Sequence, residues 1–423
     1  MTKMKESGID WIGQIPEEWE MSKIRYLVTT RSEKRITDSS VPYIGLENIE
    51  SQTGKFVKTG IQVDKSENIV VEIGDVLFGK LRPYLRKYWR ATFTSTASSE
   101  FLVFQSSELD MNFLYYAIQS DSFIEEVNTS TYGSKMPRAS WEYIKNMRIA
   151  FPTSLVEQQK IADFLDKKTT QLDKVKSLLE EQIQKLKDYR ASLIYKTVTK
   201  GLDKTVPMKD SGIDWIGQVP QGWGVNRLKY LANKIGSGKT PLGGSEIFEE
   251  TGILFIRSQN VHNGLIQLED KSTYINRNIH RQMIGTSVEK NDILLNITGA
   301  SIGRVAKYDL DVEANVNQHV CIIRCDRLVL PDYLMYFIMS EFGQFMIKIH
   351  QISGNREGLS FDNIGNFKII IPDLDYQYKI SQYLNKKMLI INQMIKTKDQ
   401  QIENINKQRQ TLIYDYVTGK RRV

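Results

Sequence analysis

The segment SGIDWIGQIPEEW at residues 7–19 occurs a second time as SGIDWIGQVPQGW at residues 211–223. The opening SGIDWIGQ is identical in the two copies, and both copies close with a tryptophan, Trp19 and Trp223. Two copies in a chain of 423 residues indicate an internal repeat, which constrains the architecture more than any other feature. We therefore expect two related halves, each opened by this duplicated segment.

The likeness between the two halves fades after the duplicated segment and returns only much later. RIAFP at 148–152 corresponds to KIIIP at 368–372, and both read as strands. A glycine-containing loop and a short helix start precede each of them, with Ser140 and Ser360 as the expected N-caps. Each half therefore has the predicted order of duplicated segment, variable block and strand.

A long segment without proline follows each of these strands, at residues 154–200 and from 373 to about 418. Leucine recurs at every seventh residue of the first segment, with Ile161, Val175 and Ile183 near the other apolar position, which is typical of a coiled-coil seam. We expect two long antiparallel helices packed on each other, of roughly 65 to 70 Å each at 1.5 Å per residue. A helix packed on a globular core is the simpler alternative. The predicted seam residues are Leu165, Leu172, Leu179, Leu186, Leu193, Leu384, Ile391, Ile405 and Leu412.

With 41% hydrophobic and 25% charged residues, the composition predicts a folded soluble protein. No apolar run approaches the roughly 20 residues of a membrane helix, and the start of the chain lacks the apolar stretch of a signal peptide, so we expect a cytoplasmic location and no membrane partner. The net charge of +7 is compatible with an anionic partner. Cys321 and Cys325 alternate onto one face of an apparent strand, which favours core packing over a metal site.

The combination of these segments resembles the specificity subunits of type I restriction and modification systems, over nearly the whole chain. The resemblance rests on the duplicated segment, the helix entries FPTSLVEQQKIADFLDKK and IPDLDYQYKISQYLNKK, and the two LIY endings at 193–195 and 412–414. It implies an α+β fold in which two target-recognition domains of mixed sheet and helix are separated by two long antiparallel coiled-coil helices with pseudo-twofold symmetry. The implied domains are 1–150 (with repeat segment 4–27) and 208–370 (with repeat segment 208–231) for recognition, and 151–207 and 371–423 for the spacer helices.

The same resemblance implies a non-catalytic subunit that recognises an asymmetric bipartite sequence in double-stranded DNA, with one half-site for each recognition domain. It also implies that the helices dock two methyltransferase subunits and restriction/translocase subunits. S-adenosylmethionine, ATP and magnesium are implied for those partners, and no cofactor is implied for this chain. One position departs from the repeat: Glu157 has Tyr376 as its counterpart, so the two docking surfaces need not be equivalent.

Two other functions stay open from the residues alone. The chain could be a coiled-coil scaffold whose end domains bind proteins, or an ATP-dependent enzyme that uses GSGKT at 236–240. A phosphate-binding loop needs glycine where this chain has Asn233, and Pro241 interrupts the helix that should follow, so the spacing disfavours nucleotide binding. No Asn-Pro-Pro or Asp-Pro-Pro signature of an amino-group methyltransferase is present.

DNA recognition needs cations for phosphates, together with amide and guanidinium groups for the edges of bases. The strand-like GDVLFG at 74–79 leads into KLRPYLRKYWR, and its counterpart NDILLN at 291–296 leads into ITGASIGR. The two glycine loops and FIRSQN at 255–260 offer further side chains of these types. The predicted DNA-binding residues are Lys80, Arg82, Arg86, Lys135, Arg138, Lys239, Arg257, Gln259, Asn260, Asn296, Arg304, Asn355 and Arg356.

Overall fold

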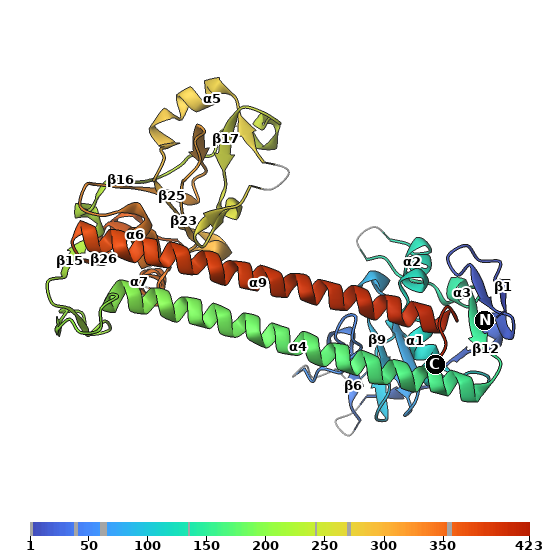
Figure 1. Cartoon of the computed structure of the whole chain (residues 1–423). Helices are drawn as coiled ribbons and strands as arrows, with labels where there is room; N and C mark the ends of the chain where they lie inside the picture. The colour runs from blue at the N-terminus through green and yellow to red at the C-terminus, as the bar shows by residue number, and fades with distance from the viewer. Residues whose placement is uncertain are drawn as a thin grey trace. The chain divides into compact units, whose positions relative to one another are not determined.

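The computed structural model describes residues 3–37, 41–59, 66–133, 136–241, 243–268, 272–352 and 358–423. The chain divides into two compact units: unit 1 is Met1–Glu181 with Lys398–Val423, and unit 2 is Gln182–Thr397. Each unit contains one variable block and part of each of the two long helices, α4 (Leu155–Lys200) and α9 (Leu374–Val417), which Figure 1 draws as single rods. The predicted α+β fold with an internal repeat is confirmed.

Unit 1 starts with a hairpin and continues into two four-stranded sheets. The hairpin joins β1 (Met4–Glu6) to β2 (Gln14–Pro16), and β3 (Trp19–Lys23) then pairs with β12 (Arg148–Pro152), which is the predicted strand. The first sheet has the order β4 (Thr29–Thr30), β11 (Phe101–Gln105), β8 (Val76–Gly79), β9 (Tyr88–Arg90). The second has the order β5 (Lys34–Ile36), β7 (Glu67–Val71), β10 (Ser95–Ala97), β6 (Tyr43–Ile44). Its helices are α1 (Met111–Ala117), α2 (Asp121–Thr129) and α3 (Trp141–Ile144).

Unit 2 repeats this plan. Its hairpin joins β13 (Met208–Asp210) to β14 (Gln218–Pro220), and β15 (Gly224–Arg227) pairs with the predicted strand β26 (Lys368–Ile371). One sheet has the order β16 (Ala232–Ser237), β25 (Val320–Cys325), β22 (Ile293–Asn296), β23 (Val305–Lys307). The other has the order β20 (Tyr274–Ile275), β17 (Ile253–Ile256), β24 (Ala314–Val316), β21 (Ser287–Val288). The small hairpin β18 (Val261–His262) with β19 (Leu265–Ile266) and the helices α5 (Arg277–Gln282), α6 (Pro331–Met339), α7 (Glu341–Ile352) and α8 (Phe361–Gly365) complete it.

The second sheet of each unit contains one parallel pair among antiparallel neighbours, β10 with β6 in unit 1 and β24 with β17 in unit 2. The central strands β8 and β22 are buried on both faces, which explains their continuous apolar runs. In β8, Val76 and Phe78 join the core that α1 and α2 cover, whereas Leu77 packs with Trp89 in a separate cluster. The two sheets therefore enclose one core and the helices close the other.

Local signals placed several element boundaries correctly. The Ser140 hydroxyl accepts a hydrogen bond from Glu142 N at the start of α3, and Ser360 does the same for Asn363 N at the start of α8. Cys321 is fully buried in β25 and Cys325 packs on the same cluster, as the alternation predicts. These features depend on residues that are near one another in the chain, so the sequence alone predicts them.

Within each unit the two long helices run antiparallel. In unit 1, Phe164 of α4 contacts Tyr416 of α9 with ring centroids 4.6 Å apart, and Asp173 lies 3.8 Å from Arg409. Along these contacts the residue number in α9 falls as the residue number in α4 rises, so the two helices run in opposite directions. In unit 2 the Arg190 guanidinium donates to Asn392 Oδ1 at 3.1 Å. No helix in the described parts of the chain is long and apolar enough to cross a membrane.

The heptad prediction for the helix seam is only partly right. Leu165, Leu384 and Ile391 are buried and the other predicted seam residues are half-buried, but Val175 is 47% exposed. The inner stripe instead recurs at every eleventh residue, which keeps it close to one face of each helix because 11 residues make only slightly more than three full turns. This stripe consists of Ile161, Leu172, Ile183 and Ile194 in α4 and of Ile380, Ile391, Ile402 and Ile413 in α9.

A buried glutamine joins each long helix to the globular part of its unit. Gln158 donates to Pro152 O at 2.8 Å and accepts from Asp110 N at 2.8 Å. Gln377 makes the matching bonds, donating to Pro372 O at 2.9 Å and accepting from Leu330 N at 2.8 Å. Each helix entry is therefore fixed by the same pair of hydrogen bonds.

Glu157 and its counterpart Tyr376, where the two halves differ, contact equivalent tryptophans of the duplicated segment. Glu157 accepts a hydrogen bond from Trp19 Nε1 at 3.2 Å. Tyr376 packs against Trp223, with ring centroids 5.6 Å apart, and its hydroxyl accepts from Leu202 N at 3.1 Å. The two side chains thus support the duplicated segment by different interactions.

Each copy of the duplicated segment also receives the end of a long helix. In unit 1, Tyr414 at the end of α9 donates its hydroxyl to Trp11 O at 2.8 Å, and Lys420 Nζ donates to Gln14 O at 2.6 Å. In unit 2, Lys200 at the end of α4 donates to Gln218 O at 2.5 Å. Two helix ends need two receiving segments, which is the structural reason for the duplication.

Candidate nucleic-acid interface

A short 3-10 helix, η2 (Leu46–Asn48), follows β6 in unit 1. The Asn48 carboxamide accepts a hydrogen bond from Gly45 N at 2.9 Å and donates to Val57 O at 3.1 Å. Because Asn48 is only 5% exposed, these bonds fix the turn from the inside. Its central residue, Glu47, is exposed.

Unit 2 contains the same turn, η6 (Ser258–Asn260), after β17. The Asn260 carboxamide accepts from Arg257 N at 2.9 Å and donates to Gln267 O at 3.1 Å. Here the exposed central residue is Gln259. We call η2 and η6 the twin turns, since the same hydrogen bonds hold a different exposed side chain in each.

The first carbonyl of each twin turn accepts a hydrogen bond from a side chain about forty residues later in the chain. Lys87 Nζ donates to Leu46 O at 2.8 Å and to Ile49 O at 2.6 Å, and desolvation lowers the pKa of this ammonium group. In unit 2, Asn296 Nδ2 donates to Ser258 O at 2.8 Å. A lysine before β9 and an asparagine at the end of β22 therefore hold the same carbonyl position.

A basic loop lies beside the twin turn of unit 1. Arg82 and Arg86 flank the 3-10 helix η3 (Pro83–Leu85) and both have left-handed backbone conformations, with φ of 51° and 54°. Such conformations are costly for residues other than glycine, and in native structures they concentrate at binding sites. Arg82 N donates to Pro137 O at 2.7 Å, and the Arg86 guanidinium forms an ion pair of 2.6 Å with Asp121. The loop is thus held in one conformation from both sides.

In each unit a third segment pairs with the loop that follows the central strand, β8 in unit 1 and β22 in unit 2. Leu81 bridges to Arg138, whose guanidinium donates to Glu100 Oε1 at 2.9 Å, and that hydrogen bond raises the pKa of Arg138. In unit 2 the counterpart of Glu100 is His319, which shares a hydrogen bond with Thr298 Oγ1. The ion pair between Arg138 and Glu100 in unit 1 thus has no equivalent in unit 2, where Gly358 and His319 occupy the corresponding places.

In unit 2 these segments enclose an open cavity of about 400 Å³. Its lining residues come from the twin turn, the loop after β22 and the start of β25, and they are Ser258, Gln259, Thr298, Gly299, Ala300, Ser301, Arg304 and His319. Gln259 and Arg304 are both exposed there. An amide and a guanidinium at one cavity are the groups that contact purine edges and phosphates in DNA.

Comparison with known proteins identifies the family. The family described as "Type I restriction modification DNA specificity domain" matches residues 16–187 and 220–404, which is most of the chain and both halves of the repeat. The chain belongs to the family of type I restriction-modification specificity subunits. Target-recognition domains are a feature of this specificity subunit, and their bounds at 1–150 and 208–370 stay a prediction.

Individual relatives agree with this assignment. The chain is 26% identical to the type I restriction enzyme MjaVIII specificity subunit of Methanocaldococcus jannaschii, covering 97% of this chain and 94% of the relative. It is 24% identical to the type I restriction enzyme EcoBI specificity subunit of Escherichia coli, covering 75% and 67%. A solved structure from a study of complex assembly and conformational transition of the type I R-M system shares the fold, with a TM-score of 0.70, 15% identity and coverage of 95% and 98%.

Two of the predicted DNA-contacting residues of this specificity subunit lie inside the fold. Residue type alone favours base contacts for Asn260 and Asn296, but they are only 6% and 0% exposed. Asn260 accepts from Arg257 N and donates to Gln267 O, and Asn296 donates to Ser258 O. A side chain without exposed surface cannot reach a base in this conformation. We therefore assign both asparagines to the support of the turn.

The other predicted residues differ in how exposed they are and in whether they form ion pairs. Gln259, Arg304 and Lys239 are exposed, and Lys80, Arg82 and Arg257 are half-buried. The guanidinium groups of Arg86 and Arg138 are engaged by Asp121 and Glu100. All of these stay predictions of DNA contact. Lys135, Asn355 and Arg356 lie outside the described residues.

The GSGKT segment has an ordinary structural role in the specificity subunit. Gly236 and Ser237 end strand β16, and the element that follows is a 3-10 turn at Gly244–Ile247. A Cβ at Gly238 would lie 1.7 Å from Val316 O, so glycine is required for close packing of two backbones. Across the described ranges no group of His, Cys, Asp and Glu could hold a metal ion.

The sequence reasoning overlooked Glu47. Its acidic side chain does not suggest contact with a polyanion, yet it occupies the place of Gln259 in the twin turn. The signal was available, because YIGLENI at 43–49 aligns with FIRSQNV at 255–261 at the asparagine that ends both turns. The structure supplies the reason to compare them.

Proposed function

We propose that each recognition domain reads one half of an asymmetric bipartite DNA sequence through its twin turn and the adjoining loop. One observation carries this proposal: the same hydrogen-bonded turn presents Glu47 in unit 1 and Gln259 in unit 2. Glutamine suits bidentate contact with adenine, whereas glutamate accepts a hydrogen bond from the amino group of cytosine. Two different readers on one scaffold favour two different half-sites.

The positive charges beside the twin turns support the same proposal. Lys80 precedes the strained arginine loop in unit 1, and Arg304 lines the cavity in unit 2. Cations at these places would contact phosphates and fix the register of the domain on the duplex, while Glu47 and Gln259 read the bases. A protein scaffold with end domains that bind other proteins would not need this combination.

We also propose that the long helices dock two methyltransferase subunits, together with restriction/translocase subunits. Apolar side chains that face solvent support this part, because exposed apolar surface marks sites of association. They are Val175 and Leu178 in α4 and Leu389, Ile390 and Met394 in α9. The chemistry would then belong to the partners, which would bind S-adenosylmethionine, ATP and magnesium, and this chain would be a non-catalytic subunit acting on cytoplasmic DNA.

The proposal is tested by coexpressing the chain with its methyltransferase subunit in a host that lacks DNA methylation. Methyladenine is then mapped over the genome by single-molecule sequencing. The expected result is a split asymmetric motif that appears only when this chain is present. A stable complex with active methyltransferase but no new motif would contradict sequence recognition and favour the scaffold function.

A further inference from the structure

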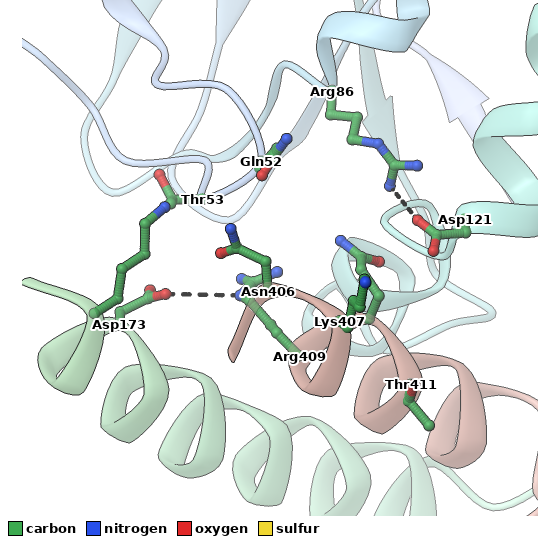
Figure 2. Close-up of a pocket in the computed structure, with 11 residues that line it drawn as sticks. Gln52, Thr53, Arg86, Asp121, Asp173, Asn406, Lys407, Arg409 and Thr411 are labelled. Atoms are coloured by element: carbon green, nitrogen blue, oxygen red, sulfur yellow. Dashed lines mark ion pairs between the residues drawn. The ribbon is translucent and has the colours of Figure 1, made fainter. Parts of the chain in front are cut away.

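A polar pocket of about 510 Å³ lies in unit 1 between the loops of the recognition domain and the two long helices (Figure 2). Gln52, Thr53 and Arg86 approach it from the recognition domain, Asp173 from α4, and Arg409 from α9. Basic side chains outnumber acidic ones in its lining. The basic residues are Arg86, Lys176, Lys407 and Arg409, and the acidic residues are Asp121 and Asp173.

The charge of Arg409 is incompletely compensated. Its side chain is 8% exposed, and one terminal nitrogen donates to Gln119 Oε1 at 3.2 Å. The nearest carboxylate oxygen, Asp173 Oδ1, lies 3.8 Å from Nε, and Nε has no hydrogen-bond acceptor among the described residues. The hydroxyl of the buried Tyr88 also forms a hydrogen bond with this guanidinium, but Nε is left without an acceptor and could bind an anionic one.

Lys176 adds a second available cation. It is half-buried in the lining of the pocket, and no carboxylate of the described residues lies within ion-pairing distance of its ammonium group. Arg86 and Lys407, in contrast, pair with Asp121 and Glu403 at 2.6 Å each. Arg409 and Lys176 are therefore the groups that would bind a ligand.

The internal repeat provides a comparison within the same chain. Arg190 takes the place of Arg409 in unit 2, and Asn392 takes the place of Asp173, with a hydrogen bond of 3.1 Å between them. The cavity beside Arg190 measures only about 50 Å³, and Leu265, Met339 and Met388 line it. The site beside Arg190 is therefore nearly closed, whereas the equivalent site beside Arg409 is an open pocket.

We propose that the pocket of unit 1 binds a phosphate group, and that this phosphate belongs to the backbone of the target duplex. The assignment of this phosphate to the duplex rests on the proposed function. Arg86 ends the loop that starts with Lys80 and Arg82, so the pocket adjoins the segment that is predicted to contact DNA. A phosphate contact at this place would position the duplex and carry no sequence information.

Lys176→Gln tests the proposal in the complex with the methyltransferase subunit, with Lys174→Gln as the matched control. Lys174 is an exposed lysine of the same helix that does not line the pocket. Affinity for a duplex with the recognised motif is measured between 50 and 200 mM salt. Lys176→Gln should weaken binding about three- to tenfold at low salt, lower the slope of log K against log salt by about 1, and leave the methylated sequence unchanged. Lys174→Gln should behave as wild type.

A second titration distinguishes the source of the phosphate. Inorganic phosphate is titrated into the wild-type complex and into Lys176→Gln and Arg409→Gln by calorimetry. Phosphate binding that both substitutions abolish, with unchanged DNA affinity, would support the pocket and overturn the assignment to the duplex. Wild-type behaviour of both variants in both measurements would overturn the site. If wild type gives no split motif, the proposed function fails, while the phosphate titration still tests the pocket.

Discussion

Asn296 donates a hydrogen bond of 2.8 Å from Nδ2 to the carbonyl oxygen of Ser258, a residue 38 positions earlier in the chain. In unit 1 the same carbonyl belongs to Leu46 and is held by Lys87. At the position of Asn296, unit 1 has Gly79, where a Cβ would lie 3.0 Å from the Leu46 side chain. The two domains thus maintain one turn geometry with different donors, and the exposed residue of the turn is free to differ.

Glu47→Gln should change one half of the methylated motif and leave the other half intact. Glutamine would offer a donor and an acceptor where glutamate offers only acceptors, so the preferred base at one position should shift by about 1 to 3 kcal/mol. Methylome sequencing of the coexpressed complex measures this. Gln259→Glu is the matched exchange in unit 2 and should alter the opposite half. A motif unchanged by both substitutions would contradict base reading by the twin turns.

Asn296→Ala should lower the free energy of unfolding by about 1 to 3 kcal/mol, because Ser258 O loses its buried donor. Thermal denaturation of the purified complex measures the change. Gln318→Ala is the control, since Gln318 is an exposed amide two residues before the buried Val320. An equal, small effect of both substitutions would mean that Asn296 is not needed for the turn.

Leu389→Ser should weaken assembly with the methyltransferase subunit. Leu389 lies on α9 and is 73% exposed, so the substitution leaves the helix pair intact and removes apolar surface from the proposed docking face. We expect a rise in Kd of roughly ten- to a hundredfold, as burial of one leucine contributes about 1.5 to 3 kcal/mol. Lys386→Ser on the same helix should have little effect. Copurification in equal yield for both variants would place the docking face elsewhere.

Alkaline pH should destabilise the fold through buried tyrosines. Burial raises the pKa of Tyr115 and of Tyr308 to about 12, whereas an unfolded tyrosine titrates near 10. Between these values the unfolded chain releases protons that the folded chain retains. The contribution of these two tyrosines to the free energy of unfolding should therefore be fully present below about pH 10 and should decline as pH rises through about 12.

Melting temperatures between pH 8 and 12, with phenolate absorbance as a second readout, measure this decline. Tyr308→Phe removes one of the titrating groups and should make the decline shallower. A melting temperature that stays constant up to pH 12 would contradict the proposed burial of both hydroxyl groups.

Residue patterns predicted the features that depend on neighbours along the chain. The N-caps Ser140 and Ser360 and the bounds of α4 and α9 agree with the sequence, because capping and proline exclusion act over one helical turn. The seam of the helices agreed less well. The recurring leucines predicted a heptad with Val175 near its second apolar position, but the inner contacts follow the eleven-residue stripe, which drifts less around the helix than a heptad does.

By itself the sequence determined the two-part plan of this protein: two duplicated segments, two variable blocks and two long helices. Only the tertiary structure decided which polar side chains face solvent. Asn260 and Asn296 bond to the backbone inside the domain, while Glu47 stands in the place of Gln259. The physical reason is that a buried polar group must find a partner, and the donors that hold Ser258 O and Leu46 O lie about forty residues away in the chain, which local patterns cannot reveal.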